Sequence, residues 1–401
     1  MPNKKRRAFR QPNDSAGTLC DNVSSMNRAA AALRSSSYIV CDCEGTDLGS
    51  EGGSLSIISL AVLPTDADPN PPVFLIDAIA LSDDKLQPIY DLLRSSDHKK
   101  IMYDARSDFS EFYHRHGVEL DNVLDLQLAD IGSRQRRQET QEARLARLPP
   151  YCGAEEIKNH RRLYTKVERL NGLGPCATEH GIVGPDEKGK SRFFPHNKWG
   201  ERPLWRLHIK YAVKDIRLIS RLFDHFTRNR YINEEKLRAQ SARYMALRKD
   251  SLKQPGGGHP LLPLDIIAAP PITQGRRACL SCSRQLGLLC FPKTPRGQST
   301  ANCCYVCSAV MTHDAEVRAK QEAQREQQRR QAQEKQKQAN TQRKQQQPSS
   351  ADQSSMYRSP SRSESPFVIT SADLARGLII FGYNDESTPG GTYLRDMYDS
   401  D

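Results

Sequence analysis

Between residues 36 and 130, short apolar runs alternate with amphipathic stretches, a pattern typical of a mixed α/β domain. Three β-rich runs predict consecutive strands at 38–44, 54–62 and 72–80. Apolar residues at helical spacing then predict a helix over 82–96, followed by a short strand at 99–104. A second helix, 108–117, ends at Gly117, and a strand-like run covers 120–130.

The regular pattern is interrupted by a long polar stretch from 131 to about 200. A strongly periodic amphipathic helix then follows, with Pro203 as its predicted start. Residues 250–275 are rich in Pro and Gly and are typical of a linker. From 313 to 347 apolar residues are almost absent, so a helix there would have no face to bury.

Two carboxylates, Asp42 and Glu44, interrupt the first apolar run, "YIVCDCEG". Alternate side chains of a strand share a face, so these two acids would project together and repel each other. One interpretation is a strand end that enters solvent, with Glu44 beginning the turn that Gly45 completes. The other is a shared divalent cation, because Mg²⁺ and Mn²⁺ prefer carboxylate oxygen.

Composition narrows the class of protein. The 401-residue chain has a mean hydropathy of −0.69, too polar for a chain folded throughout, which predicts substantial disorder in its C-terminal third. Its net charge of +11 suits a polyanionic partner. No apolar run could span a membrane and the N-terminus lacks a secretory signal, so we expect an intracellular protein. The cluster "KKRR" near the N-terminus favours the nucleus over the cytoplasm.

Two further acids complete a candidate metal site. Tyr211 and Asp215 stand at i and i+4 of the amphipathic helix and therefore share one face. Asp108 lies near the start of the helix that follows the fourth strand. Together with Asp42 and Glu44, this makes four carboxylates and one tyrosine on three elements. Two metal ions that hydrolyse a phosphodiester need about this many oxygen ligands.

On these residues the chain resembles the DEDD superfamily of 3′–5′ exonucleases, in its tyrosine-bearing branch. The three motifs are "DCEG", "YDARSDFSEFYHRHGVELDNVLDLQLAD" and "YAVKD". Within that branch it is similar to the ribonuclease D, Werner-type and Egalitarian-like group, which "VFLIDAIAL", "LNGLGPC" and "ERPL" also echo. The resemblance covers residues 36 to about 230. It implies an α/β fold of the ribonuclease H-like class, with a mixed sheet flanked by helices.

The resemblance also implies a role for each motif residue. Asp42 would bridge two Mg²⁺ or Mn²⁺ ions, and Glu44 would bind one of them and orient the attacking water. Asp108 would hold the second ion through water, and Asp215 would complete the first site. Tyr211 would hydrogen-bond the nucleophilic water. Asp104 also lies in the second motif, but it stands where the strand ends and is expected to cap the helix.

The chain departs from the family pattern in two places. The strand after the first motif, "SLSIISLAV", lacks the glutamine usual in this group, and the segment between Asp125 and Tyr211 is long. From 131 to 210 that segment carries 17 Lys and Arg against 9 Asp and Glu. The interleaved aromatics are Tyr151, Tyr164, Phe193, Phe194, Trp199 and Trp205. The segment is either a track for a single strand or a solvated loop with aromatics packed on the core, where we place Trp205.

Six of the eleven cysteines lie between Cys279 and Cys307. "CLSC" and "CYVC" form two CxxC pairs with 21 residues between them, a spacing close to that of zinc-ribbon sites. The predicted ligands of one structural Zn²⁺ are Cys279, Cys282, Cys304 and Cys307. Cys303 is an alternative to Cys304. A closed site of four thiolates has no open position for water, so its role would be structural.

The sequence therefore predicts a metal-dependent 3′–5′ exonuclease acting on RNA or single-stranded DNA. The alternative is a nucleic-acid-binding scaffold that keeps the exonuclease fold without activity. A protein partner could bind the zinc module and the C-terminal tail. The predicted division is a disordered basic tail (1–30), the exonuclease domain (31–235), a helix end and linker (236–275), the zinc module (276–312), a low-complexity segment (313–365) and a C-terminal tail (366–401).

Overall fold

The computed structural model describes residues 17–184, 194–250, 252, 259–262, 275–282, 284–292 and 302–345. The chain divides into two compact units, Met1–Ala315 and Glu316–Asp401. Every residue predicted to carry chemistry falls in the first unit. The basic cluster near the N-terminus and the C-terminal tail lie outside the described residues.

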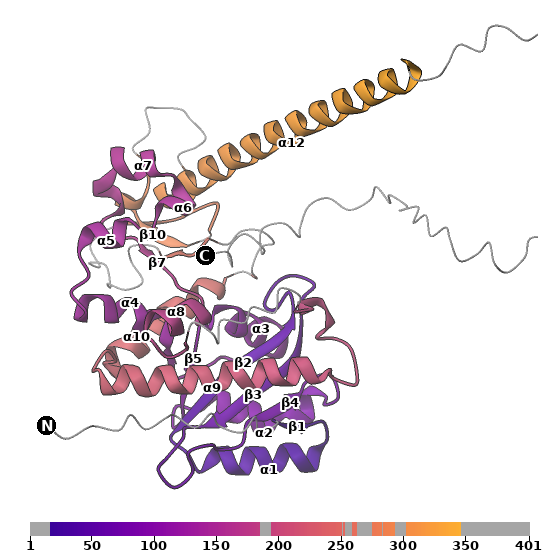
Figure 1. The fold of residues 1–401 in the computed structure, drawn as a ribbon. Helices are drawn as coiled ribbons and strands as arrows, with labels where there is room; N and C mark the ends of the chain where they lie inside the picture. Colours follow the sequence, from indigo (N-terminus) through magenta and orange to yellow (C-terminus); the bar gives the residue numbers. More distant parts are fainter. Residues whose placement is uncertain are drawn as a thin grey trace, which may run out of the picture. The chain divides into compact units, whose positions relative to one another are not determined.

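The first unit is built on a six-stranded mixed sheet in the order β1-β4-β3-β2-β5-β6 (Figure 1). Its strands are β1 (Thr18–Cys20), β2 (Tyr38–Thr46), β3 (Ser54–Val62), β4 (Phe74–Asp77), β5 (Lys99–Met102) and β6 (Val123–Asp125). β2, β3 and β4 form the antiparallel meander that the sequence predicts. β5 and β6 add to β2 in parallel, and β1 pairs in parallel with β4.

Helices cover both faces of this sheet. One hydrophobic cluster joins it to α1 (Val23–Arg34), α2 (Asp83–Arg94) and α3 (Arg106–His116). A second cluster joins the opposite face to α4 (Leu126–Arg136), α8 (Leu173–Glu179), α9 (Arg206–Arg228) and α10 (Glu234–Met245). Figure 1 shows α9 running across the sheet. The predicted ribonuclease H-like class, a mixed sheet flanked by helices, is thereby confirmed.

Three local predictions differ from the structure. Residues 17–30 were expected in a mobile tail but contribute β1 and most of α1, which buries Met26, Ala29 and Leu33. The strand-like run 120–130 becomes helical after Asp125, because that side chain accepts a hydrogen bond from the Gln127 amide and caps α4. The amphipathic helix α9 begins at Arg206, beyond Pro203.

The polar stretch after α4 forms short elements of its own. These are α5 (Gln141–Leu145), α6 (Pro149–Cys152), α7 (Ala154–Asn159), η1 (Arg161–Tyr164) and β7 (Glu168–Arg169). β7 pairs antiparallel with β8 (Leu261–Leu262), from the predicted linker. Two further strands, β9 (Arg276–Ala278) and β10 (Gln285–Gly287), form a hairpin in the cysteine-rich region.

The second unit is described only through the part of α12 (Tyr305–Gln345) that follows Ala315. Its described side chains are nearly all polar and exposed, as expected of a helix without an apolar face. Across the part of the chain that the structure describes, no helix has the length and apolar character needed to cross a membrane.

Candidate active site and cysteine cluster

Strand β2 places Asp42 and Glu44 on the sheet face that α9 covers. Val40, two residues earlier, packs in the cluster on that face. Cys41 and Cys43 point the opposite way and pack with α1, α2 and α3. The register of β2 against β3 shifts immediately after Glu44, at a β-bulge, and such bulges often re-aim side chains beside active sites.

The next residue, Gly45, keeps β2 close to its neighbour. A Cβ at this position would lie 2.1 Å from the carbonyl oxygen of Ser54 on β3, so no larger residue fits. The alternation in "CDCEG" thus has a structural reason at each position: cysteines face the core, acids face α9, and glycine allows the strand to bend.

Three carboxylates converge from two elements. Ligand oxygens of Asp42 and Glu44 on β2 and of Asp215 on α9 all lie within 4.8 Å of one another. Tyr211, one turn before Asp215, is hydrogen-bonded to that carboxylate. The three acids are half-buried, so a ligand from solvent can reach them.

Asp108 lies deeper than the other acids, in the first turn of α3, and is only 5% exposed. Among the described residues, no group hydrogen-bonds to its Oδ1, which is fully shielded from solvent. The tight group of three carboxylates does not include it, but its charge raises the pKa of Asp42. Asp108 therefore flanks the group on the side of Asp42.

The electrostatics of the site disfavour so many negative charges without a cation. Burial, and then the carboxylates of Asp108 and Asp215, raise the pKa of Asp42 well above its ordinary value. Burial raises the pKa of Asp108 to about 7, although hydrogen bonding from Cys43 opposes this shift. Burial likewise raises the pKa of Asp215 to about 6, against the hydrogen bond from Tyr211.

The second acid of the motif, Asp104, has different surroundings. Its carboxylate makes two hydrogen bonds to Arg106, at 2.6 and 2.8 Å, and its φ is +56°. It does not cap α3, whose N-cap residue is Ala105 with no side-chain cap. The prediction that Asp104 caps this helix is therefore wrong.

Asp125 is a positioning residue to which the sequence motifs assigned no role. Its two oxygens accept hydrogen bonds from the amides of Asp104 and Ala105, at 3.1 and 3.0 Å, and it is fully buried. It therefore holds the start of the helix that carries Asp108. The sequence feature that could have identified Asp125 is its position, an acid at the end of an apolar strand and directly before an apolar helical run.

Aromatic residues before α9 surround the tyrosine of the site. The Phe194 ring lies 4.3 Å from that of Tyr211, centroid to centroid, and Trp199 is 1% exposed. Arg202 anchors this segment through two hydrogen bonds to Asp77, at 2.6 and 2.7 Å. Trp205 was expected in the core, but it is 44% exposed because it precedes the first turn of α9.

Several basic side chains of the 131–210 segment serve structural ion pairs. Arg134 is 1% exposed and contacts Asp130 at 2.9 Å and Glu168 at 3.2 Å. Arg137 and Arg147 both bind Glu179. For these residues the structural interpretation is favoured over a substrate track, because Asp130, Glu168 and Glu179 already pair with them.

The aromatic residues of this segment are also mostly unavailable to a substrate. Tyr151, Tyr164 and Trp199 are buried, while Phe193 lies outside the described residues. Asp130, Cys176 and His180 form another compact group of ligand atoms. Asp130 is occupied there by His180, Arg134 and Asn171, so this group belongs to the hydrogen-bonded core.

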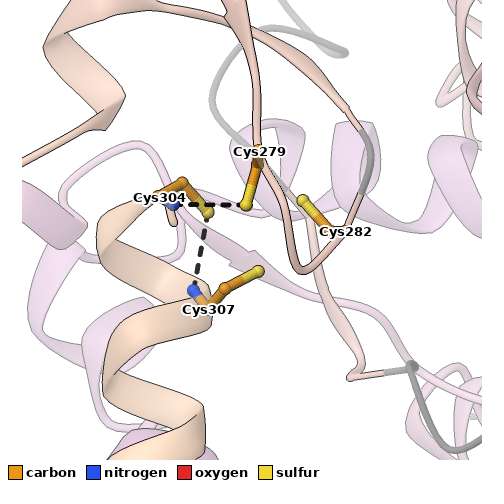
Figure 2. Close-up of side chains that lie close together, drawn as sticks. All are labelled: Cys279, Cys282, Cys304 and Cys307. Carbon is orange, nitrogen blue, oxygen red and sulfur yellow. Dashed lines mark hydrogen bonds between the residues drawn. The ribbon is translucent and has the colours of Figure 1, made fainter. Parts of the chain in front are cut away.

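The four predicted zinc ligands are brought together (Figure 2). Cys279 and Cys282 lie on the turn after β9, while Cys304 and Cys307 stand at the start of α12. Ligand atoms of all four lie within 4.8 Å of one another. Backbone amides of Cys304 and Cys307 donate to the thiols of Cys279 and Cys304, at 3.2 and 3.5 Å.

The four thiols share hydrogen bonds that favour the thiolate form at Cys279 and raise the pKa of Cys304 and Cys307. Hydrogen bonds from the other three thiols lower the pKa of Cys279. His259 Nε2 lies 3.3 Å from the Cys307 sulfur and can donate to it. Cys303 is partly exposed and does not belong to the group of four, so Cys304 and not Cys303 supplies the thiol of this cluster. Such a cluster can hold a zinc ion.

The cysteines share a hydrophobic core with the segment inserted after α4. Leu145 and Leu148 from the α5–α6 region, and Tyr164 and Val167 before β7, pack in one cluster with all four cysteines. The region from 145 to 167 is thus covered by the cysteine-bearing turns, and the pairing of β7 with β8 ties the same parts together.

Comparison with known proteins places the N-terminal region. Residues 19–148 match the model of a family described as 3′–5′ exonuclease. Among solved structures the chain is similar to RNase D of Trypanosoma brucei complexed with RNA, at 18% identity and a TM-score of 0.46, over 62% of this chain and 77% of that one. No curated protein sequence matches the chain.

Two further structures show a similar likeness. Escherichia coli RNase D is 17% identical, over 58% of this chain and 50% of that chain, with a TM-score of 0.38. The exonuclease domain of Aedes aegypti Nibbler is also 17% identical, over 58% and 97%, with a TM-score of 0.39. The matched family segment contains Asp42, Glu44 and Asp108. This segment of the chain is therefore similar to a 3′–5′ exonuclease domain, the kind of nuclease domain that the sequence predicts.

Proposed function

We propose that this protein is a metal-dependent 3′–5′ exonuclease that hydrolyses phosphodiester bonds of RNA or single-stranded DNA. The observation that carries the proposal is the convergence of Asp42, Glu44 and Asp215 within 4.8 Å on a half-buried surface. Their mutual repulsion, added to the charge of Asp108, makes the site costly without a cation. Two divalent ions would remove that cost.

The donor set fits hard divalent cations. All candidate ligands are carboxylates, the oxygen donors that Mg²⁺ and Mn²⁺ prefer. The buried Oδ1 of Asp108, which no described group hydrogen-bonds, is the kind of atom that a metal-bound water would satisfy. We assign Asp42, Glu44 and Asp215 to a first ion, and Asp42 and Asp108 to a second. When bound, two such ions activate water and neutralise charge developing on the phosphate.

The protein's own groups would position the attacking water. Burial and the neighbouring carboxylates raise the pKa of Tyr211, so its hydroxyl stays protonated at neutral pH and can donate a hydrogen bond. Tyr211 donates its one hydrogen to Asp215, which fixes the hydroxyl beside the carboxylates and leaves its oxygen to accept a hydrogen bond from the attacking water. Glu44 is half-buried and can accept a hydrogen bond from the same water.

We also propose one structural Zn²⁺ bound by Cys279, Cys282, Cys304 and Cys307. Four thiolates close a tetrahedral site, so this ion would take no part in hydrolysis. Its role would be to stabilise the core that the cysteines share with residues 145–167.

The direct test is digestion of RNA and DNA strands labelled at either end, with Mg²⁺, Mn²⁺ or EDTA. We expect a 3′ label to leave first as a mononucleotide, while a 5′-labelled strand shortens stepwise. Asp42→Asn should abolish both changes, and Asp47→Asn, at an exposed acid near the end of β2, should not. Strands that are bound but never shortened would instead support the inactive scaffold.

A further inference from the structure

A separate cavity of about 430 Å³ lies between α4, α10 and residues 165–168. This volume is in the range of small-ligand sites in proteins. Figure 1 shows α4 and α10 together near one end of α9. The end is the carboxyl-terminal one, since α10 follows α9 in the chain, whereas Tyr211 and Asp215 lie in the first half of α9. No proposed catalytic residue lines the cavity.

The lining of this cavity is strongly basic. Four cationic side chains, Arg136, Arg144, Lys166 and Lys236, face a single acid, Glu168. Arg136, Lys166 and Lys236 are exposed and form no ion pair with any residue that the structure describes. Their charges are therefore available to an anion from solution.

The one acid is already neutralised. Glu168 contacts Arg144 at 2.7 Å and Arg134, behind the cavity wall, at 3.2 Å. Arg144 also donates to the carbonyl of Thr165 at 2.9 Å. Its Nε is nonetheless buried with no hydrogen-bond partner among the described residues. The wall thus presents excess positive charge and one unsatisfied guanidinium donor.

The rest of the lining suits a planar group that stacks on apolar surface and forms hydrogen bonds at its edge. Leu128, Ile131 and Leu237 supply buried apolar surface, and Tyr231 adds an aromatic ring. Side chains of Gln135 and Asn233 supply amides at the exposed rim. A nucleotide combines these needs, because its phosphate pairs with cations and its base stacks and hydrogen-bonds.

We propose that this cavity binds one nucleotide unit, with its phosphate beside Arg136, Arg144, Lys166 and Lys236 and its base on the apolar wall. The inference rests on the proposed function, in which the chain binds nucleic acid. The unit can be a free mononucleotide, such as the product of exonuclease cleavage, or one nucleotide of a bound strand that passes beyond the catalytic carboxylates.

The test compares Arg136→Gln/Lys236→Gln with Arg28→Gln/Arg34→Gln, which removes the same charge from α1. Both pairs are made in full-length Asp42→Asn protein, which should not cleave the strand. Binding of AMP and of a single-stranded oligoribonucleotide is measured across a range of salt. All four side chains are exposed, so folding should survive, and circular dichroism checks it.

If the site takes free nucleotides, the cavity pair should weaken AMP binding about tenfold or more. If it takes a nucleotide within a strand, oligonucleotide binding should weaken and its slope of log affinity against log salt should fall by about 1.4, from about 0.7 per lost phosphate contact. The proposal would be overturned if the cavity pair bound AMP as tightly as the α1 pair does and also bound the oligonucleotide as tightly. Turnover of a dinucleotide by the cavity pair, with Asp42 intact, tests the exonuclease proposal separately.

Discussion

Asp104 and Asp108 are four residues apart in one motif, yet their surroundings differ. Asp108 is buried with an unsatisfied oxygen, whereas Asp104 is paired with Arg106 and partly exposed. Chemistry at this motif should therefore depend on Asp108 alone.

We expect Asp108→Asn to reduce exonuclease turnover by several orders of magnitude, because it removes a charge that balances the metal ions while preserving shape. Asp104→Asn should retain most of the turnover. Asparagine tolerates the positive φ at that position, and a partly exposed ion pair contributes at most about 1 kcal/mol. Steady-state rates on labelled RNA provide the comparison. A dead Asp104→Asn enzyme beside an active Asp108→Asn enzyme would show that the metal site is wrongly assigned.

The raised pKa of Asp108 also predicts a pH dependence of stability. Burial moves this pKa from 3.8 to about 7. Between these two pH values the folded chain therefore holds a proton that the unfolded chain has lost. Its contribution to stability is present below about 4 and is lost as the pH rises through about 7. Without added Mg²⁺ or Mn²⁺, Asp108→Asn should gain stability relative to the original protein as the pH rises from about 5 to about 8.

Thermal melts of both proteins over this range measure that difference. Added Mg²⁺ should stabilise the original protein more than the variant at the higher pH, since the ion binds the ionised carboxylates. A constant difference between the two proteins, with and without Mg²⁺, would argue against a buried titrating carboxyl at this position.

At the scale of elements, α4 carries arginines with opposite roles. Arg134 is enclosed with Asp130 and Glu168, while Arg136 is exposed at the cavity rim. We expect Arg134→Gln to lower the free energy of unfolding by about 3 kcal/mol or more, because it removes the one cation that two buried acids, Asp130 and Glu168, share. Arg136→Gln should change it by less than about 0.5 kcal/mol.

Urea unfolding followed by circular dichroism gives both values. The two variants also separate folding from substrate affinity, because both remove one positive charge from the same helix. An Arg134→Gln protein as stable as Arg136→Gln would mean that the buried ion pairs contribute nothing to the fold.

At the scale of the whole first unit, the cysteine cluster and the inserted helices depend on each other. Residues 145–167 pack on the cysteine-bearing turns, so loss of the proposed zinc should loosen this region while the six-stranded sheet remains. We expect about one zinc per chain in the full-length protein, and little in Cys279→Ser/Cys282→Ser.

Metal analysis and limited proteolysis check this prediction together. New cleavage sites should appear between 141 and 167 in the double variant, although these residues lie far from the cysteines in sequence. Cys303→Ser is the matched control and should keep both its zinc and its resistance to protease. Full zinc content in the double variant would contradict the assignment of the ligands.

The sequence alone determined the features that depend on local spacing. Alternation along β2 placed Asp42 and Glu44 on one face, and helical spacing aligned Tyr211 with Asp215. The paired CxxC spacing predicted the four cysteines that the structure brings together. Apolar periodicity likewise predicted most of the strands and the main helices of the sheet domain.

Only the tertiary structure decided which charged side chains are free and which are paired within the fold. Arg134 and Arg136 look alike in the sequence, but the acids that neutralise Arg134 include Glu168, 34 residues away. The hydrogen bonds from the Asp104 and Ala105 amides to Asp125, and the shared core of the cysteines with residues 145–167, are also long-range contacts. Local propensity carries no information about such partners, because folding selects them by packing segments that are distant along the chain.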